Sequence, residues 1–193
     1  MAAERASRQS RLAATPPAEM ESAVREKCLR LLAQQPRTRS ELERALSRAG
    51  APDDIVATVL ERFAGVGLID DTAYAEAYMR TGVGVRRRGS RSLRSELRVR
   101  GVAPEVIDVA SAQVDEDGER ASAMALATRR AAALSRLAPE VARRRLTGQL
   151  LRRGFAPSLV SSVVSEALRD AAAALEWDPV PDDLVLETES EQE

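Results

Sequence analysis

The sequence predicts an all-α protein: three tandem three-helix repeats in an elongated array, with a disordered N-terminal arm and an acidic C-terminal tail. Three observations lead to this prediction. Hydrophobic residues make up 44% of the 193 residues but aromatic residues only 3%, and a chain rich in alanine, leucine, arginine and glutamate favours helices over strands. Apolar residues recur at helical spacing. The sequence also repeats itself at offsets of 51 residues (42 to 93) and 53 residues (93 to 146), which indicates a repeat architecture.

The repeated feature is a pair of leucines one helical turn apart, followed by a glycine and then a proline. The three sets are Leu42, Leu46, Gly50 and Pro52; Leu93, Leu97, Gly101 and Pro104; and Leu146, Leu150, Gly154 and Pro157. We expect the leucines to bury the middle helix of each repeat, and the glycine to end it in the left-handed backbone conformation. The predicted segments are an arm at 1–18, repeats at 19–66, 67–114 and 119–175, and a tail at 176–193.

The first repeat is predicted to begin with a helix from Met20 that stops before Pro36. Its second helix opens at Thr38 or Ser40, since hydroxyl side chains cap helix N-termini, and it ends at Gly50. The arm before this repeat is rich in alanine, serine and arginine and has no periodicity. We therefore expect the arm to be disordered.

The second repeat is predicted to open with Asp70 as a helix cap. Tyr74 and Tyr78 follow one turn apart on one helix face, and we interpret them as core residues of a small helical bundle. The middle helix of this repeat starts near Ser90 or Ser92.

The third repeat is predicted to follow an acidic linker at 115–118. Its first helix carries an alanine-rich face, which includes Ala123, Ala127 and Ala131 and must pack closely. The tail at 176–193 holds eight acidic residues and no basic ones. It acts either as a solubility tail or as an intramolecular competitor for the arginine-rich surface.

The residue types that are missing limit the possible chemistry. There is no histidine, which excludes a histidine general base and the usual zinc sites. The single cysteine, Cys28, can close no internal disulfide, as is typical of intracellular proteins. No apolar run has the length of a membrane span. We therefore predict a cytoplasmic protein that is not an enzyme and has no catalytic residues, no metal and no cofactor. We separately expect a monomer.

Positive charge is concentrated between residues 86 and 100, where seven arginines stand against one glutamate. Arg91, Arg94 and Arg98 fall within about 60° of arc on one helix face, away from the leucines. The first repeat has serine and glutamate at these positions, so folding does not require arginine there. The candidate partner-binding residues, from the second and third repeats, are Arg86, Arg87, Arg88, Arg91, Arg94, Arg98, Arg100, Arg144, Arg145, Arg152 and Arg153.

Two explanations of these arginines stay open. A run of charge is usually a solvated helix face, and a helical scaffold without regulatory activity would need no more than that. Seven like charges in fifteen residues repel one another, however, so an anionic partner is an economical explanation. One such partner is nucleic acid, whose phosphates arginine binds well.

The stretch that holds these arginines resembles part of a known family. The residues that carry the resemblance are Leu68-Ile69-Asp70-Asp71, Tyr74-Ala75, Tyr78, Gly89, Leu93, Glu96-Leu97 and Arg100-Gly101-Val102. They are similar to the central repeat of the RecX regulatory proteins, and the resemblance spans about residues 20 to 170.

The resemblance implies three tandem three-helix repeats and a function in DNA repair, recombination and the SOS response. It implies a bacterial modulator that binds the RecA recombinase and its filament on DNA and inhibits ATP hydrolysis, strand exchange and coprotease action. It also implies a protein that is not an enzyme. The alternative is a helical repeat protein that binds single- or double-stranded DNA directly.

Overall fold

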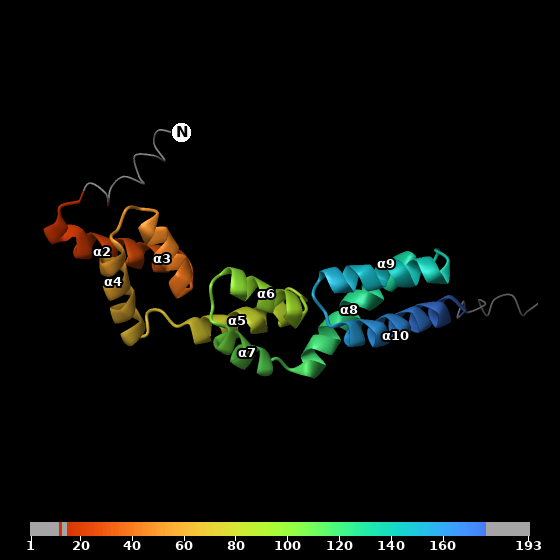
Figure 1. Cartoon of the computed structure of the whole chain (residues 1–193). Coiled ribbons are helices and arrows are strands. Elements are labelled where there is room, and N and C mark those ends of the chain that lie inside the picture. Colours follow the sequence, from red (N-terminus) through yellow and green to blue (C-terminus); the bar gives the residue numbers. More distant parts are fainter. Residues whose placement is uncertain (1–11, 13–14, 177–193) are drawn as a thin grey trace, which may run out of the picture.

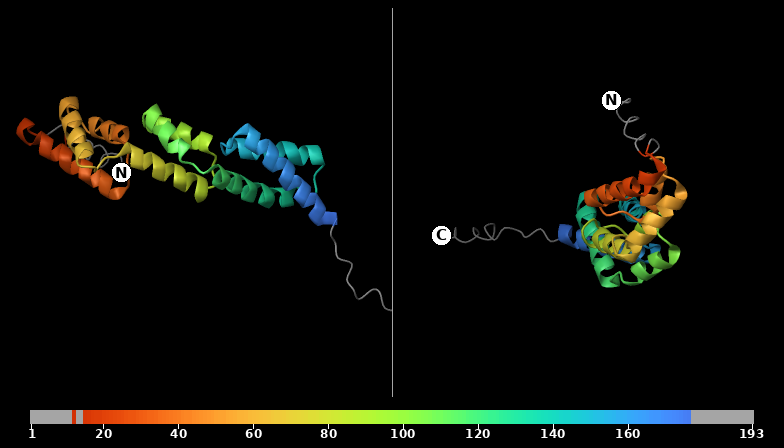
Figure 2. Two further views of the ribbon diagram at one scale, coloured as in Figure 1. Left: turned by 90° about the horizontal axis from the view of Figure 1, so that it is seen from below. Right: turned by 90° about the vertical axis from the view of Figure 1, so that its left-hand side faces the viewer.

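The computed structural model describes residue 12 and residues 15–176. Within this part of the chain, nine α-helices form three consecutive three-helix units, and no β-strand occurs. The units follow one another in an elongated array (Figure 1), which Figure 2 shows from two further directions. The predicted all-α array of three repeats is therefore confirmed. Apart from Glu176, the predicted acidic tail lies outside the described residues.

Each repeat consists of three helices in chain order. Repeat 1 comprises α2 (Pro17–Gln34), α3 (Arg39–Ser47) and α4 (Asp53–Gly65). Repeat 2 comprises α5 (Asp71–Gly84), α6 (Ser90–Val99) and α7 (Pro104–Ala112). Repeat 3 comprises α8 (Glu116–Leu134), α9 (Pro139–Arg152) and α10 (Pro157–Glu176).

Local signals in the sequence fix several helix starts. The Thr38 hydroxyl oxygen accepts from the backbone N–H of Glu41 at 3.2 Å, and the Glu41 carboxylate accepts from the backbone N–H of Thr38 at 3.3 Å. This reciprocal pair satisfies two N–H groups that the first turn of α3 would leave unpaired. Asp70 caps α5 in the predicted way, since its carboxylate accepts from the backbone N–H of Ala73 at 2.9 Å.

Two segment predictions need correction. The arm was predicted to be disordered up to residue 18, but α2 begins at Pro17 because proline suits the first turn of a helix. Leu12 is also buried against the core of repeat 1. The predicted acidic linker at 115–118 is largely the first turn of α8: Asp115 accepts from the backbone N–H of Asp117 at 3.2 Å, and the helix begins at Glu116.

Each repeat has a hydrophobic core of its own. The six repeated leucines are fully buried, as predicted. In repeat 3 the alanine face of α8 packs directly against the core residues of α9 and α10. Cys28 is buried in the core of repeat 1, where burial raises its pKa to about 11. This thiol is therefore a small core residue rather than a reactive group.

The three repeated glycines end the middle helices as predicted. Gly50, Gly101 and Gly154 have φ angles of +88°, +82° and +88°, in the left-handed region. In each case the following residue donates its backbone N–H to a carbonyl of the last helical turn, that of Leu46, Leu97 or Leu150. This is the usual way in which glycine closes a helix C-terminus.

The joint between repeats 1 and 2 is formed where the C-terminal end of α6 meets the start of α3. Thr38 Oγ1 donates to the carbonyl of Arg100 at 2.7 Å, and the backbone N–H of Arg39 donates to Asp71 Oδ1 at 2.9 Å. The Arg100 guanidinium also donates to Glu41 Oε1 at 2.6 Å. The end of α6, the middle helix of repeat 2, is thus bound to the first turn of α3, the middle helix of repeat 1.

The joint between repeats 2 and 3 uses the equivalent positions. Gly89 lies 51 residues after Thr38, and its backbone N–H donates to the carbonyl of Arg153 at 2.9 Å. The backbone N–H of Ser90 donates to Glu119 Oε1 at 2.9 Å. In both joints, the start of a middle helix contacts two groups of the next repeat. One is a backbone carbonyl next to a left-handed glycine, and the other is a carboxylate from the first helix of that repeat.

These joints predict that Gly101→Ala is more costly than Gly50→Ala. Both positions have positive φ, which costs an L side chain about 1 kcal/mol. Gly50 is exposed, whereas a Cβ atom at Gly101 would overlap the side chain of Ser40 across the joint. Urea unfolding should therefore show a loss of about 1 kcal/mol for Gly50→Ala and a further loss of about 1–3 kcal/mol for Gly101→Ala. Equal losses would contradict the close contact at this joint.

Candidate functional site

The turn between α5 and α6 presents the first arginines of the predicted binding set. Arg86 and Arg87 are exposed, and Arg87 has a φ of +48°, which is uncommon for a residue other than glycine. On α6, Arg91 and Arg98 are exposed as well. None of these four arginines has an ion-pair partner among the residues that the structure describes.

Three members of the predicted set form ion pairs within the protein. Arg94 pairs with Asp108 of α7 at 2.6 Å. Arg88 pairs with Glu96 through its two terminal guanidinium nitrogens, Nη1 and Nη2. Glu96, the one acidic residue within the arginine run, binds Arg88, and the partner of Arg94 comes from another helix of the repeat.

Arg100 is the third engaged arginine, and it belongs to the joint between repeats 1 and 2. Besides its bond to Glu41, its guanidinium lies 5.2 Å from the centre of the Tyr78 ring, within the range of a cation–π contact. These contacts hold the end of α6 against α3 and against the first helix of repeat 2.

Repeat 3 continues the basic surface. Arg144 and Arg145 on α9 and Arg152 at its last turn are exposed, without ion-pair partners in the described part of the chain. Arg153 is exposed too, but its guanidinium donates to the carbonyl of Arg86 at 3.3 Å across the joint. This contact brings the basic segments of repeats 2 and 3 together.

We call the unpaired members of the predicted set the arginine surface: Arg86, Arg87, Arg91, Arg98, Arg144, Arg145 and Arg152. The two helices that carry most of them, α6 and α9, lie on the same side of the array in Figure 1. Guanidinium groups that have no internal carboxylate keep their hydrogen-bond donors for an anionic partner.

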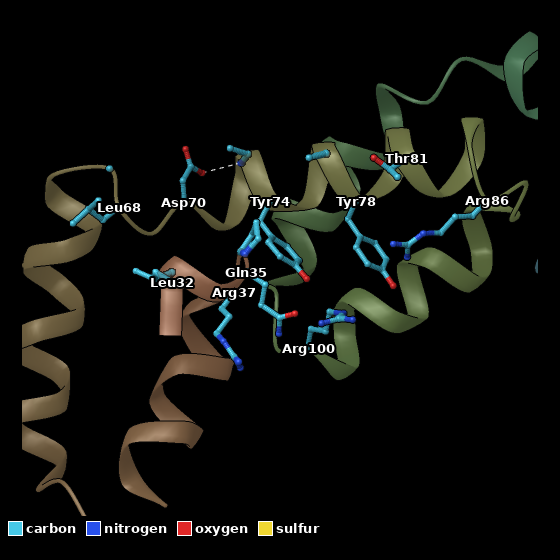
Figure 3. A pocket seen from close by; sticks show the side chains of 14 residues that line it. Leu32, Gln35, Arg37, Leu68, Asp70, Tyr74, Tyr78, Thr81, Arg86 and Arg100 are labelled. Carbon is cyan, nitrogen blue, oxygen red and sulfur yellow. Dashed lines mark hydrogen bonds between the residues drawn. The ribbon is translucent and has the colours of Figure 1, made fainter. Parts of the chain in front are cut away.

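A groove lies beside this surface at the joint between repeats 1 and 2 (Figure 3). It has a volume of about 590 Å³ and is bordered by the end of α2, the α4–α5 connection and one face of α5. Tyr74 and Tyr78 lie at its centre with their ring centroids 6.0 Å apart and their planes 14° apart. The side chains of Arg37, Arg86 and Arg100 lie around the two rings.

The tyrosines are therefore only partly core residues, which corrects the interpretation made from the sequence. Both rings are half-buried and pack on the edge of the repeat 2 core. The face of α5 that enters the core consists of Ala75, Met79 and Val83. That face was hard to see because alanine and methionine give a weaker apolar pattern than two tyrosines one turn apart.

Hydrogen bonds fix the rim of the groove. The Tyr78 hydroxyl donates to Glu96, which also accepts from Arg88. Burial acts against ionisation of Glu96, but these bonds outweigh it and hold the pKa of this carboxyl below its usual range. Burial and the hydrogen bond to Glu96 raise the pKa of Tyr78. At neutral pH, Glu96 is therefore a carboxylate and Tyr78 is a neutral donor.

Arg37 is a residue of this region that sequence reasoning missed. Its Nε atom is buried and has no hydrogen-bond partner in the described part of the protein. The only signal in the sequence was an arginine between a proline and a helix cap. Three arginines and one carboxylate, Asp70, line the groove, so it suits a negatively charged group that also carries apolar surface.

The described residues contain no group of three or more cysteine, aspartate or glutamate side chains that could hold a metal ion. None of the described helices is long and apolar enough to cross a membrane.

The fold and the surface define a protein class: a tandem three-helix repeat protein with an arginine-rich surface. Models of the first, second and third three-helix domains of RecX match residues 25–63, 70–110 and 117–164. The chain belongs to the RecX family of regulatory proteins.

Relatives support this assignment over most of the chain. The regulatory protein RecX of Thermobifida fusca is 37% identical over 167 residues, which cover 86% of this chain and 90% of that protein. The regulatory protein RecX of Mycolicibacterium vanbaalenii is 42% identical over 147 residues, covering 73% and 80% respectively. The crystal structure of RecX from Lactobacillus salivarius has the same fold, with a TM-score of 0.73 at 23% identity, over 78% of this chain and 97% of that one.

Proposed function

We propose that this protein acts in the cytoplasm as a monomer that binds the RecA recombinase on its DNA filament. Binding inhibits ATP hydrolysis, strand exchange and coprotease action. The observation that carries the proposal is the arginine surface, which extends over two consecutive repeats and has no ion-pair partner among residues 12 and 15–176. An elongated array with such a surface can contact several repeating anionic groups along a filament. The proposal includes no catalytic step.

The test is a double variant, Arg91→Ser with Arg98→Ser. Both side chains are exposed on α6, and repeat 1 folds with serine at both equivalent positions, Ser40 and Ser47. Arg94 is kept because its pairing with Asp108 supports repeat 2. We expect the concentration needed for half-inhibition of RecA-driven ATP hydrolysis to rise about tenfold, which corresponds to about 1.4 kcal/mol of binding free energy.

A matched control removes two exposed arginines from repeat 1, Arg25 and Arg30 on α2. The loss of total charge is the same, so a specific surface predicts little change in inhibition for this control. Equal weakening by both variants would point to a general charge effect, and unchanged inhibition by the α6 variant would refute the proposed surface.

Direct binding to DNA is the second candidate, and exposed guanidinium groups in two repeats favour it too. The two candidates differ in whether binding requires RecA. If the arginines act on DNA alone, binding to bare single-stranded DNA should fall with salt as steeply as binding to the RecA filament, and the double variant should weaken both equally.

A further inference from the structure

A small basic pocket lies between α8 and α9 in repeat 3. Its volume is about 290 Å³, and its lining consists of Leu126, Arg130, Gln149, Arg152 and Arg153. The three arginines are exposed and have no ion-pair partner in the described part of the chain. None of the residues that line the pocket is acidic. Three positive charges therefore share one pocket whose lining contains no carboxylate to balance them.

Local contacts position two of these arginines. The Arg153 guanidinium donates to the carbonyl of Arg86 at 3.3 Å, which uses one of its five donors. A Cβ atom at Gly148 would lie 3.2 Å from Arg152 Nη1, so the Arg152 guanidinium lies close to the backbone of α9. Glycine inside a helix is destabilising, but at Gly148 it leaves room for this guanidinium. Both charged groups are therefore held at the pocket by the fold.

The corresponding place in repeat 2 contains a carboxylate. The repeated leucines of α6 and α9 are 53 residues apart (93 to 146), so Gln149 of repeat 3 corresponds to Glu96 of repeat 2. Glu96 pairs with the Arg88 guanidinium and accepts from the Tyr78 hydroxyl. The Gln149 amide carries no charge and cannot balance a guanidinium, but its NH₂ group can donate to an anion.

The phenol of repeat 2 is replaced in repeat 3 as well. Asp71 and Glu119 hold equivalent places at the two joints, since each accepts from a backbone N–H at the start of the preceding middle helix. Leu126 follows Glu119 by seven residues, just as Tyr78 follows Asp71 by seven. Arg130 lies one helical turn after Leu126 and adds a further cation. The polar groups that satisfy one another in repeat 2 are thus replaced in repeat 3 by donors and cations alone.

We infer that this pocket binds a phosphate group, with Arg130, Arg152 and Arg153 as its cationic ligands and the Gln149 amide as a neutral donor. Guanidinium groups bind phosphate through pairs of hydrogen bonds, and the tetrahedral oxygens reach donors from several side chains at once. A planar carboxylate has only two oxygens and meets fewer of these donors. The phosphate belongs either to a nucleic-acid backbone or to a free phosphate compound. The inference does not require binding to RecA.

Gln149→Glu tests the pocket, because it introduces the carboxylate that repeat 2 has at this position. The parent protein should bind tripolyphosphate in isothermal titration calorimetry at low salt. The variant should bind it about tenfold more weakly, since the new carboxylate repels the anion and pairs with the arginines. Its urea midpoint should stay the same or rise. The matched control is Gln34→Glu, the same change at an exposed residue of α2, which should bind tripolyphosphate as the parent does.

Arg130→Gln is a second variant that does not depend on the first. Arg130 is exposed, so the substitution should leave folding intact, and Arg130 is not a member of the arginine surface. Binding of tripolyphosphate should weaken severalfold. Arg136→Gln is its control, because Arg136 is also exposed in repeat 3 but does not line the pocket. This control should leave tripolyphosphate binding unchanged.

Two further probes separate the possible ligands. If Gln149→Glu weakens binding of a short oligothymidylate as much as binding of tripolyphosphate, the pocket takes a nucleic-acid phosphate. If only tripolyphosphate binding weakens, the pocket takes a free phosphate compound. Penta-aspartate represents an acidic peptide and should bind the parent protein more weakly than tripolyphosphate does.

Four results would overturn the inference. They are no binding of tripolyphosphate by the parent protein, binding of penta-aspartate that is equally tight or tighter, equal effects of Gln149→Glu and Gln34→Glu, and unchanged tripolyphosphate binding by Arg130→Gln.

Discussion

Leu93→Ala is expected to lower the free energy of unfolding by about 2–5 kcal/mol, the usual cost of emptying a buried leucine site. Leu93 is completely buried between α5, α6 and α7. Its side chain fits against Gly82 of α5, where any Cβ atom would overlap it. The helices are held close at this point, so the neighbours have little freedom to fill the space that alanine would leave. The loss should therefore lie in the upper half of the range.

Val99→Ala on the same helix is the matched control, because Val99 is 74% exposed. This variant should change stability by less than about 0.5 kcal/mol. Urea titrations followed by circular dichroism would give both values. A loss of less than about half a kcal/mol for Leu93→Ala would mean that this face of α6 does not form the core of repeat 2.

The repeat pattern could be predicted from the sequence because it depends on local rules. Two leucines one turn apart define a buried helix face, and a glycine after them defines where the helix ends. Both rules act within about ten residues. The buried position of Leu97 and the helix end at Gly101 can therefore be predicted without any knowledge of the tertiary structure. The same applies to Asp70, whose cap involves a backbone N–H three residues away.

The candidate site depends on contacts that no local rule contains. Arg100 and its partner Glu41 are 59 residues apart, and Arg94 and Asp108 are 14 residues apart on different helices. A run of arginines therefore looks uniform in the sequence, although some of its members stabilise joints and others remain free. Sorting them requires the positions of the neighbouring helices.

The joints also connect the fold to the proposed function. The arginine surface is divided between repeats 2 and 3, so its geometry depends on how rigidly these repeats are held together. At their joint, the carbonyl of Arg153 accepts from the backbone N–H of Gly89 and from the Ser92 hydroxyl, at 2.9 and 3.1 Å. In addition, the hydroxyl of Ser122 donates to the carbonyl of Val83 at 3.0 Å. The two bonds to the Arg153 carbonyl fix the start of α6 relative to the end of α9, and the bond from Ser122 joins α8 to α5.

Gly89→Ala tests this connection and is expected to cost about 3 kcal/mol or more. Gly89 is buried, and a Cβ atom there would overlap the backbone of Gly154 and Phe155. Backbone atoms cannot rotate away as a flexible side chain would, so the joint must open or the repeats must shift. Unfolding should lose cooperativity, with repeat 3 melting apart from the remainder, because stability in a repeat array depends on the interfaces between neighbours.

Gly84→Ala is the control, since Gly84 is exposed at the end of α5 and a Cβ atom there meets no other atom within 4 Å. It should leave both the unfolding transition and the proposed inhibition of RecA nearly unchanged. Gly89→Ala should weaken inhibition although every arginine is still present, because the two halves of the arginine surface no longer keep their spacing. Full inhibition by a Gly89→Ala protein whose repeats unfold separately would show that one repeat is sufficient for binding, and that the joint serves stability alone.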